Sequence, residues 1–470
     1  MKHSAIFLAF LGLFLFFAYP SVSSAPFAYD EADYMYAAQR GLLANYLDLP
    51  SLSFPEYVRL GMSTRTNSRQ NSSMSVAVRR AGDMFLYRHA HGPVYFYWLG
   101  LLSKWSGAEY FIRASGLVFP ILTAAAISVG CLWVLPGAQG QIAAILGCAL
   151  YLFNPAVIRS TEVAPHQMFT MWFTMTLLLV AKLRMEGSRR LWYAAVVATG
   201  LAFCTLEVAF VLIAVVLICG YVERKRLRFD WRLAGISSVL FAATVAVVHP
   251  AAITRLAFAK SYLFYAYLAL KRTAPWGDVT FAGTWIHRFS ASPVAWVLIA
   301  IALFIWVRFR DLPGRAQAFP FLLFGTLMAA SMLRVLTTGL RYMLPFLPAL
   351  LAFTAIIVSG AVIRLRPNLR GAVLAVTCAA LFLDLYRYTA AHPIRSDPRL
   401  GLLIAEIKRQ NLAAGRLLVP HDDLPTIHYY FREADATPYV DESSLPAGRF
   451  DAMIHMGESG KIDRMSPGLN

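Results

Sequence analysis

The sequence contains few charged residues and few cysteines for its length. Charged residues make up 15% of the 470 residues, whereas hydrophobic residues make up 58% and the mean hydropathy is +0.55. No soluble protein of this length needs so much apolar surface for its core, so the composition excludes a soluble globular protein and indicates a polytopic membrane protein. The cysteines lie in apolar stretches and not in polar loops, so neither a disulfide framework nor a thiolate metal site is implied. They are Cys131, Cys148, Cys204, Cys219 and Cys378.

Acidic residues are scarcer than basic ones, at 26 against 43, and the formal net charge is +17. Such an excess could indicate a nucleic-acid partner, but the Lys and Arg residues stand in short runs between apolar segments, as they do in cytoplasmic loops. We therefore expect no nucleic-acid partner. The sequence also lacks an internal repeat long enough to indicate a transporter built from inverted halves.

The apolar segments predict an all-α membrane fold with about eleven spans. Residues 4–19 form the first, and Pro26 disfavours signal-peptide cleavage after them, so we expect a retained helix. Residues 191–221 would make a helix about 45 Å long, well beyond the ~30 Å hydrocarbon core, and both flanks are basic. A hairpin that turns near residues 205–207 is therefore predicted. The other predicted spans are 113–133, 141–157, 166–181, 233–249, 293–307, 319–335, 342–363 and 371–386.

The rule that basic loops stay in the cytosol orients the chain. Residues 93–106 are rich in Tyr and Trp and are predicted to form an amphipathic helix in the outer interface, since a further span there would move later basic loops outside. Within the first outer loop, the stretch from Ser63 to Ser75 is predicted to be mobile. The loops expected on the outer face are 20–112, 158–165, 250–292 and 336–341, together with the C-terminal tail.

The tail changes character after the last apolar segment. We expect residues 1–390 to form the membrane domain and residues 391–470 a small α/β domain outside the membrane. Its predicted elements are a helix from Leu400 to Gln410, a strand from Arg416 to Pro420, a helix near Leu424–Phe431 and a strand around Phe450–Met456.

An acidic cluster of Asp30, Glu31 and Asp33 follows the first apolar segment. Carboxylates are costly inside a bilayer and cheap just outside it, so this cluster can face both water and lipid headgroups. On helical spacing Asp30 and Asp33 share a face with Tyr34, and Glu31 lies about a quarter-turn away. The alternative is a solvated helix start whose acids complement the helix dipole.

The outer loops also contain cations and histidines that could act together with these acids. Acids beside cations at one membrane surface suit attack on a phosphate-linked carbon, because a carboxylate can take the acceptor's proton while cations hold the departing phosphate. Cations there could instead bind anionic headgroups, which is the favoured interpretation of Lys260, Lys271 and Arg272. The remaining candidates are His91, Arg113, Glu162, His166, Arg341 and Tyr342.

A divalent metal is a second use for these groups. His91 and His166 could ligate one with Glu31 or Glu162, but no two of them have a spacing that fixes a site, so a hydrogen-bonded interfacial histidine is the simpler interpretation. Asp33, Glu162 and His166 are candidates for contacting an acceptor or a metal. Glu207, at the tip of the predicted hairpin, could reach the same outer cavity, but a solvated turn residue is the simpler interpretation.

Arg341 stands at the outer end of a predicted helix and is followed by Pro345 and Pro348. An arginine at a membrane boundary commonly extends its head into the interface. Prolines break backbone hydrogen bonds and often line a cavity, so a phosphate-holding role for Arg341 is predicted beside the ordinary one.

Several short motifs occur in a specific order along the chain. Together with the apolar first helix, they resemble the GT-C fold membrane glycosyltransferases, in particular the protein O-mannosyltransferase and aminoarabinose (lipid A) transferase branch, which includes bacterial transferases that decorate lipopolysaccharide. The resemblance covers residues 1 to about 390. The motifs are YDEADY at 29–34, HGPVYFY at 91–97, RASG at 113–116 and RYMLP at 341–345.

The resemblance implies an inverting transferase that takes a sugar from a polyprenyl-phosphate carrier and passes it to a glycan, lipid or protein acceptor. It places the protein in a bacterial inner or plasma membrane, among membrane lipids, with the active site on the extracytoplasmic side. Asp30 would be the catalytic carboxylate, with Glu31 beside it. Arg341 and the His91–Pro93 region would hold the lipid phosphate or shape the carrier groove. No cofactor is certain, and a divalent metal is the one that the family resemblance leaves open.

The chain departs from the family pattern at three places. The family often has two prolines after the histidine, where this chain has Gly92-Pro93; an aspartate near the position of His166; and a lysine where Glu207 stands. These departures leave the donor and the use of a metal open. Two other functions remain: a lipid or glycan transporter or flippase, which predicts paired charges and broken helices near the bilayer midplane, and a non-catalytic subunit of a cell-envelope assembly system that has kept the fold.

Overall fold

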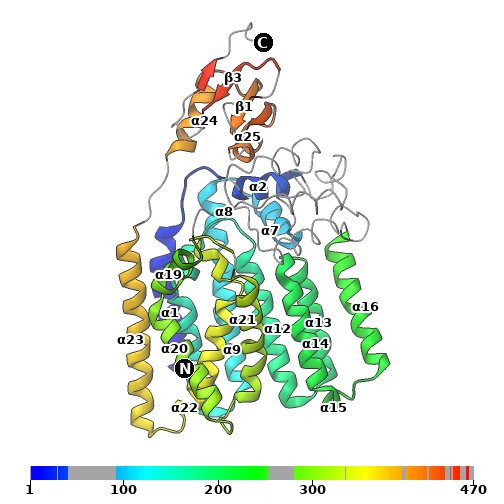
Figure 1. Cartoon of the computed structure of the whole chain (residues 1–470), viewed down its shortest axis with the longest axis vertical. Coiled ribbons are helices and arrows are strands. Elements are labelled where there is room, and N and C mark those ends of the chain that lie inside the picture. Colours follow the sequence, from blue (N-terminus) through cyan, green and yellow to red (C-terminus); the bar gives the residue numbers. More distant parts are fainter. Residues whose placement is uncertain are drawn as a thin grey trace.

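The structure is a computed structural model, and it consists of a helical bundle with a small sheet domain beyond one end (Figure 1). It describes residues 2–28, 30–40, 91–250, 252, 280–333, 335–393, 398–420, 423–439, 445, 448–455 and 462–464.

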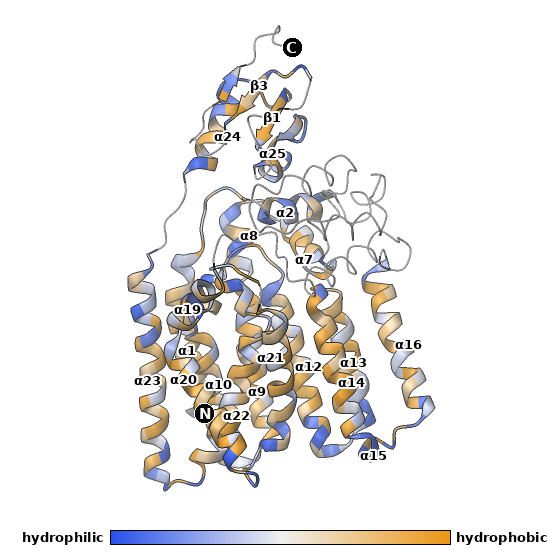
Figure 2. Cartoon of the chain, in the orientation of Figure 1, coloured by the Kyte–Doolittle hydropathy of each residue, from blue (hydrophilic) through white to orange (hydrophobic). Residues whose placement is uncertain are grey.

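Long apolar helices form the bundle, and Figure 2 shows apolar residues along their lengths with hydrophilic residues gathered toward the ends. The bundle helices are α1 (Lys2–Ala18), α9 (Val118–Val134), α10 (Gly137–Leu152), α12 (His166–Glu186), α13 (Arg189–Phe203), α14 (Phe210–Val222), α16 (Trp231–Val248), α20 (Pro293–Arg308), α21 (Arg315–Ser331), α22 (Leu347–Val362) and α23 (Pro367–Ala391).

Short helices lie at the end of the bundle that faces the sheet domain. They carry or support most of the candidate site residues, so they are the part of the fold that matters most for function. They are η1 (Tyr19–Ser21), α2 (Asp30–Arg40), α7 (Val94–Ser103), α8 (Glu109–Ser115), α11 (Pro155–Arg159), η2 (Glu207–Ala209), α19 (Phe281–Ala291) and the 3-10 helix η3 (Leu340–Met343). At the opposite end, α15 (Arg224–Leu227) links α14 to α16 (Figure 1).

Each of the eleven predicted apolar segments contains a helix. Five helices among the described residues are long and apolar enough to cross a bilayer alone, and α19 with α20 makes a sixth candidate although the pair is bent by 93°. Since α10, α14 and α22 are shorter than a full span, helix length does not establish the predicted count of eleven. The five are Ser4–Ser21, Glu109–Val134, His166–Glu186, Trp231–Val248 and Pro367–Ala391.

Two boundaries follow directly from local chemistry. The hairpin predicted over 191–221 is confirmed, since α13 and α14 form a pair that turns at η2. The span expected over 342–363 begins only at Leu347, because Pro348 lacks an N–H and fits only in the first turn of a helix. The residues before it form η3, which leaves Arg341 outside the long helix.

The bundle core lies along α9, α10, α12, α21 and α22. Its largest fully buried side chains include Tyr151, Phe169, Phe173 and Phe321, which pack in one continuous apolar cluster. In contrast, α16 and α23 lie at the margins of the bundle and leave much of their apolar surface exposed, as expected of helices that face lipid (Figure 1).

The C-terminal domain contains a four-stranded sheet of order β2-β1-β3-β4. Strand β1 (Arg416–Pro420) pairs in parallel with β2 (Asp435–Tyr439) and β3 (Ala452–Ile454), and β3 pairs antiparallel with β4 (Ile462–Arg464). Helices α24 (Arg399–Arg409) and α25 (Leu424–Tyr430) pack on it. The two predicted helices and two predicted strands are confirmed.

Candidate functional site

The acid predicted as catalytic lies beside the late arginine. Arg341, on η3, donates from Nη2 to Asp30 Oδ2 over 2.8 Å and from Nη1 to Glu162 Oε2 over 3.1 Å. The same guanidinium lies 3.0 Å from the Tyr342 hydroxyl and 4.9 Å from the centroid of its ring. Asp30 begins α2 and Glu162 lies between α11 and α12, so three distant parts of the chain meet at one cation.

The three charged groups differ in their access to water. The Arg341 side chain is 17% exposed, whereas those of Asp30 and Glu162 are 46% and 38% exposed. A mostly buried cation therefore holds two carboxylates that remain open to a solute. This arrangement holds both carboxyl groups in fixed positions while leaving other lone pairs of their oxygens open.

Arg341 and Glu162 change each other's proton affinity. Burial alone would lower the pKa of Arg341, but Glu162, Tyr342 and Asp30 outweigh it, so the pKa lies well above its usual range and the guanidinium stays charged. Burial raises the pKa of Glu162; Arg341 opposes that shift, and the neighbouring charges of Glu31 and Asp30 add to it. The Glu162 carboxyl therefore holds a proton more readily than an ordinary glutamate.

Glu31 points into a different, more enclosed cluster. Arg113 of α8 forks onto it, with 2.9 Å from Nε to Oε1 and 2.5 Å from Nη2 to Oε2. The Val163 amide also donates to Glu31 Oε1 over 2.9 Å. Arg113 donates in addition to the carbonyls of Ser23 and Ala25, at 2.9 and 2.6 Å. This ion pair joins the chain before α2, the last turn of α8 and the loop before α12, which sets the position of Asp30.

His91 also has an acidic partner. Its Nδ1 lies 2.7 Å from Glu207 Oε2, and both side chains are nearly buried. The simple interpretation of Glu207 as a solvated turn residue is therefore wrong, because the apolar hairpin tip turns inward onto the histidine. Burial lowers the pKa of His91, but the charge and hydrogen bond of Glu207 outweigh it, so that pKa lies above its ordinary value. The His91 ring also lies 5.6 Å from that of Tyr34, on the same helix as Asp30.

Gly92 explains one departure from the family pattern. A Cβ at this position would lie 2.1 Å from the backbone oxygen of Cys204 at the hairpin turn, which is far inside van der Waals contact. The Val94 amide donates to that same carbonyl over 3.1 Å. The close approach of these two backbones admits only glycine, so a second proline here would push the hairpin, and with it Glu207, away from His91.

The other predicted residues lie around this centre. His166, the first residue of α12, is buried, and its ring meets that of Tyr342 edge-on with centroids 5.6 Å apart. Its Nδ1 is buried without a hydrogen-bond partner. Asp33 is buried on α2. The structure thus brings Asp30, Glu162, His166, Arg341 and Tyr342 together, and holds Glu31 with Arg113, and His91 with Glu207, at the sides.

A metal does not have an obvious ligand set here. Among the residues that the structure describes, no group of three or more His, Cys, Asp and Glu side chains is placed to hold a metal ion. The carboxylates predicted as ligands are engaged by arginines: Glu162 by Arg341 and Glu31 by Arg113. The predicted cations Lys260, Lys271 and Arg272, and the stretch from Ser63 to Ser75, lie outside the described residues.

Arg288 is a buried arginine near this centre that was not predicted from the sequence as a site residue. It lies on α19 and is fully buried, with Nη2 donating to the Val335 carbonyl over 2.8 Å and the guanidinium 4.9 Å from the Trp285 ring. Its Nε and Nη1 have no hydrogen-bond partner, and it interacts electrostatically with Tyr342. The sequence feature that could have indicated it is an arginine among aromatic residues just before Pro293, within a predicted outer loop.

Comparisons with known proteins identify the fold. No protein-family model matches the chain, and no curated protein matches its sequence. Among solved structures, it resembles the archaeal oligosaccharyltransferase AglB from Archaeoglobus fulgidus, in complex with an inhibitory peptide and a dolichol-phosphate, with a TM-score of 0.57 and 12% identity over 93% of this chain. The match spans 64% of the length of that enzyme.

A second solved structure agrees. ArnT from Cupriavidus metallidurans, bound to undecaprenyl phosphate, matches 92% of this chain and 85% of its own, with a TM-score of 0.55 and 12% identity. The chain therefore has the GT-C fold predicted from its sequence motifs, and it is an integral membrane protein of mostly helical structure.

Proposed function

We propose that this protein is an inverting glycosyltransferase that moves a sugar from a polyprenyl-phosphate-linked donor to a glycan, lipid or protein acceptor. The observation that carries the proposal is the placement of Asp30: a half-exposed carboxylate fixed by Arg341 at the outer end of a GT-C bundle. The two solved relatives support the donor class, since one binds a dolichol-phosphate and the other undecaprenyl phosphate.

The donor phosphate would bind between Arg341, Tyr342 and Arg288. Arg288 is a buried guanidinium with two unpartnered nitrogens, Nε and Nη1, which is unfavourable by about several kcal/mol unless an anion or acceptor reaches it. A phosphate supplies charge and acceptor oxygens together, and arginine presents its donors in the fork that phosphate geometry matches. Tyr342 interacts electrostatically with both arginines, which makes its surroundings the natural position for the anion.

The chemical step is a single displacement. Asp30 accepts the proton of an acceptor hydroxyl or amine, the acceptor atom forms a bond to the anomeric carbon, and the bond from that carbon to the phosphate oxygen breaks. The leaving polyprenyl phosphate takes the electron pair and is held by the two arginines. General-base assistance of this kind contributes about 10²–10⁴-fold to a rate. Attack opposite the leaving group inverts the sugar.

The neighbouring ion pairs would position this base. Glu31 with Arg113 fixes the segment that leads into α2. His91 with Glu207 supports the same helix from the side of Tyr34. His166, with a free ring nitrogen in contact with Tyr342, is placed to contact an acceptor. In this proposal Glu31 is a positioning residue and Asp30 the catalytic one.

The proposed topology places this site on the extracytoplasmic side, in a bacterial inner or plasma membrane. The basic residues of α15 lie at the opposite end of the bundle from α2 (Figure 1), which agrees with the tendency of cytoplasmic loops to be positive. Residues 391–470 would then form an extracytoplasmic domain above the site.

The test compares cells that make the wild-type protein, the Asp30→Asn variant or no protein. Mass spectrometry of envelope glycans and lipid extracts should reveal one saccharide increment that is present with wild type and absent with D30N, together with accumulation of the sugar-linked carrier lipid. Asp311→Asn is the matched control, because Asp311 is an exposed carboxylate paired with Arg364 at 3.2 Å. An unchanged increment in D30N at equal membrane abundance would overturn the proposal.

A further inference from the structure

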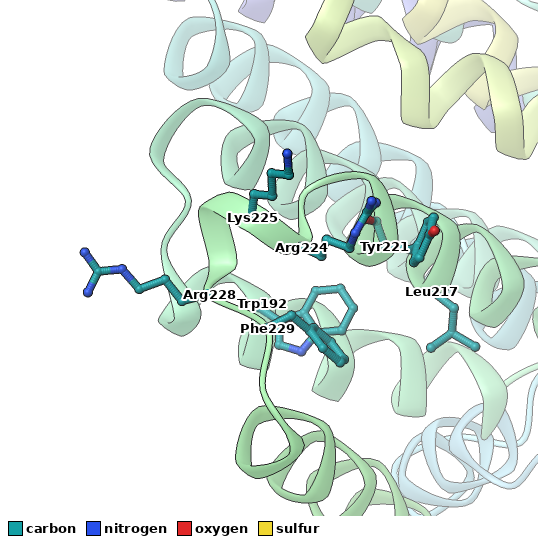
Figure 3. A pocket seen from close by; sticks show the side chains of 7 residues that line it. All are labelled: Trp192, Leu217, Tyr221, Arg224, Lys225, Arg228 and Phe229. Atoms are coloured by element: carbon teal, nitrogen blue, oxygen red, sulfur yellow. The ribbon is translucent and has the colours of Figure 1, made fainter.

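A cavity lies where α13, α14 and α15 meet (Figure 3). This end of the bundle is opposite the end that carries α2 (Figure 1). Its volume is about 560 Å³. Trp192 of α13 is nearly buried at its base and is fixed by a 2.7 Å hydrogen bond from Nε1 to Ser237 Oγ. Gly220 makes room for the indole, since a Cβ there would lie 2.4 Å from the ring. The hydrogen bond and the close packing against Gly220 therefore hold the Trp192 side of the cavity in place.

The apolar lining continues onto the surface that faces lipid. Leu217 and Tyr221 of α14 line the cavity and are 61% and 66% exposed, and Phe229 lines it and is 46% exposed. In a helix that packs in a membrane, such side chains contact acyl chains. The cavity is thus open to the bilayer as well as to water.

The polar lining consists of cations. Arg224, Lys225 and Arg228 line the cavity, and no acidic residue does. Arg224 is fixed over Tyr221, 4.2 Å from the ring centroid, and donates to the Tyr221 carbonyl over 3.0 Å. Figure 3 shows Lys225 and Arg228 reaching outward from the rim. The left-handed turn at Arg228, with φ of 48°, ends α15 at this point.

The acids that adjoin these cations in the sequence are engaged elsewhere. Glu223 is nearly buried and lies 3.3 Å from Arg184. Asp230 pairs with Arg189 at 3.0 Å and caps α16 by accepting from the Leu233 amide over 2.7 Å.

Among the described salt bridges, none involves a lining cation. The positive charge of the cavity is therefore not compensated within the described part of the chain.

We infer that this cavity binds the headgroup of an anionic phospholipid, with an acyl chain along Leu217, Tyr221 and Phe229. A phosphate with a net negative charge matches the three cations, and the open apolar wall matches a chain that an inorganic anion lacks. Zwitterionic lipids carry a cation that the cavity would repel. The site lies at the other end of the molecule from Asp30 and does not depend on the proposed reaction.

The experiment measures lipid binding to the purified, delipidated full chain by native mass spectrometry and by thermal shift. The probes are phosphatidylglycerol, phosphatidylcholine and inorganic phosphate. The cavity variant combines Arg224→Gln, Lys225→Gln and Arg228→Gln. The control makes the same change of charge with Arg308→Gln, Arg366→Gln and Arg370→Gln, which line no part of the cavity.

Phosphatidylglycerol should bind wild type and the control in preference to phosphatidylcholine, and the cavity variant should bind it at least about tenfold more weakly, since each cation contributes to attraction of anionic lipid. Phe229→Ser should weaken the binding of phosphatidylglycerol without making the protein prefer inorganic phosphate. Equal binding of the two lipids, an equal loss in the control variant, or competition by inorganic phosphate at equal concentration would each overturn the inference.

Discussion

Arg341 and Asp30 stand 311 residues apart in the sequence, yet a guanidinium nitrogen and a carboxylate oxygen of the two lie 2.8 Å apart. Glu162 reaches the same guanidinium from a third part of the chain. The acid after the first predicted span and the late arginine therefore lie side by side at one end of the bundle. Because one cation serves two acids, its removal affects both of them.

Replacement of Arg341 should separate the role of its charge from that of its shape. R341Q leaves Asp30 and Glu162 without a shared cation and the phosphate without a donor, so sugar transfer should fall by about 10²–10³-fold, as for loss of one preorganised electrostatic donor. R341K keeps a positive charge but cannot bind two carboxylates with a planar fork, so its transfer rate should lie between those of wild type and R341Q. Initial rates in membrane vesicles at matched protein amounts measure this. Wild-type transfer by R341Q would remove the phosphate-holding role.

The neighbouring acids Asp30 and Glu31 should give different phenotypes. E31Q breaks a nearly buried ion pair and leaves Arg113 uncompensated, which costs about 3–5 kcal/mol, so its thermal midpoint in detergent should fall clearly. D30N alters a half-exposed group and should keep the wild-type midpoint while losing transfer. Thermal unfolding and transfer assays on the two variants, side by side, test the assignment. If E31Q kept its midpoint and D30N lost it, the two roles would have to be exchanged.

The sequence predicted much of this arrangement because membrane burial leaves simple signals. Long apolar segments and basic loops predicted the helices, and the resemblance of the ordered motifs at 29–34, 91–97, 113–116 and 341–345 implied the GT-C fold. Strands β2 and β4 were missed. β2 contains Pro438, and its pairing with β1 depends on residues distant in sequence; β4 has three residues and pairs with β3 at the edge of the sheet.

Other features depend on contacts that no local pattern carries. Glu207 is a polar residue at the tip of an apolar hairpin, and only the tertiary structure turns it onto His91. Arg288 was not singled out from the sequence, because only its burial and its unpartnered Nε and Nη1 distinguish it from other arginines near a membrane boundary. The clash that requires Gly92 arises from the approach of two backbones, which no single segment encodes.

The pair of His91 and Glu207 should make stability depend on pH. The folded-state pKa of His91 is raised, so the stabilisation from its protonated form is complete below the unfolded value of about 6.5 and is lost as pH rises through the higher folded value. Wild-type thermal midpoints should therefore decline from about pH 6.5 upward. E207Q removes the carboxylate that raises the pKa of His91, and burial then lowers that pKa. The decline of the thermal midpoint above about pH 6.5 should therefore disappear. An unchanged profile in E207Q would show that another group titrates.

Gly92 should tolerate no side chain. G92A must displace the Cys204 carbonyl, and the hairpin tip that carries Glu207 moves with it. We expect a loss of stability of about 2–3 kcal/mol, within the usual range for overpacking in a closed site, and a weaker pH dependence because the His91 pair is stretched. Thermal unfolding across pH measures both effects. G100A is a milder comparison, since a Cβ there would lie 3.1 Å from the Ala38 carbonyl oxygen.

The C-terminal domain should help to hold α2 in place. Thr426 donates to the Phe27 carbonyl over 3.1 Å, and the Tyr430 hydroxyl accepts from the Phe27 amide over 2.9 Å while donating to Glu109 over 2.6 Å. Phe27 lies just before Asp30, so these hydrogen bonds from α25 fix the entry into α2. Each is worth about 1 kcal/mol, and the variant T426V/Y430F removes them without changing the fold of the sheet.

In that variant, amide hydrogen exchange over residues 22–35 should become faster and sugar transfer should decrease, because the start of α2 is free to move relative to Arg341. The matched control is Tyr439→Phe, which removes a hydroxyl that donates to the Ile454 carbonyl inside the sheet domain. Y439F should leave exchange over 22–35 at the wild-type rate even if it lowers the stability of the domain. Equal acceleration in both variants would mean that domain stability as a whole, and not the hydrogen bonds from α25 to Phe27, controls the position of Asp30.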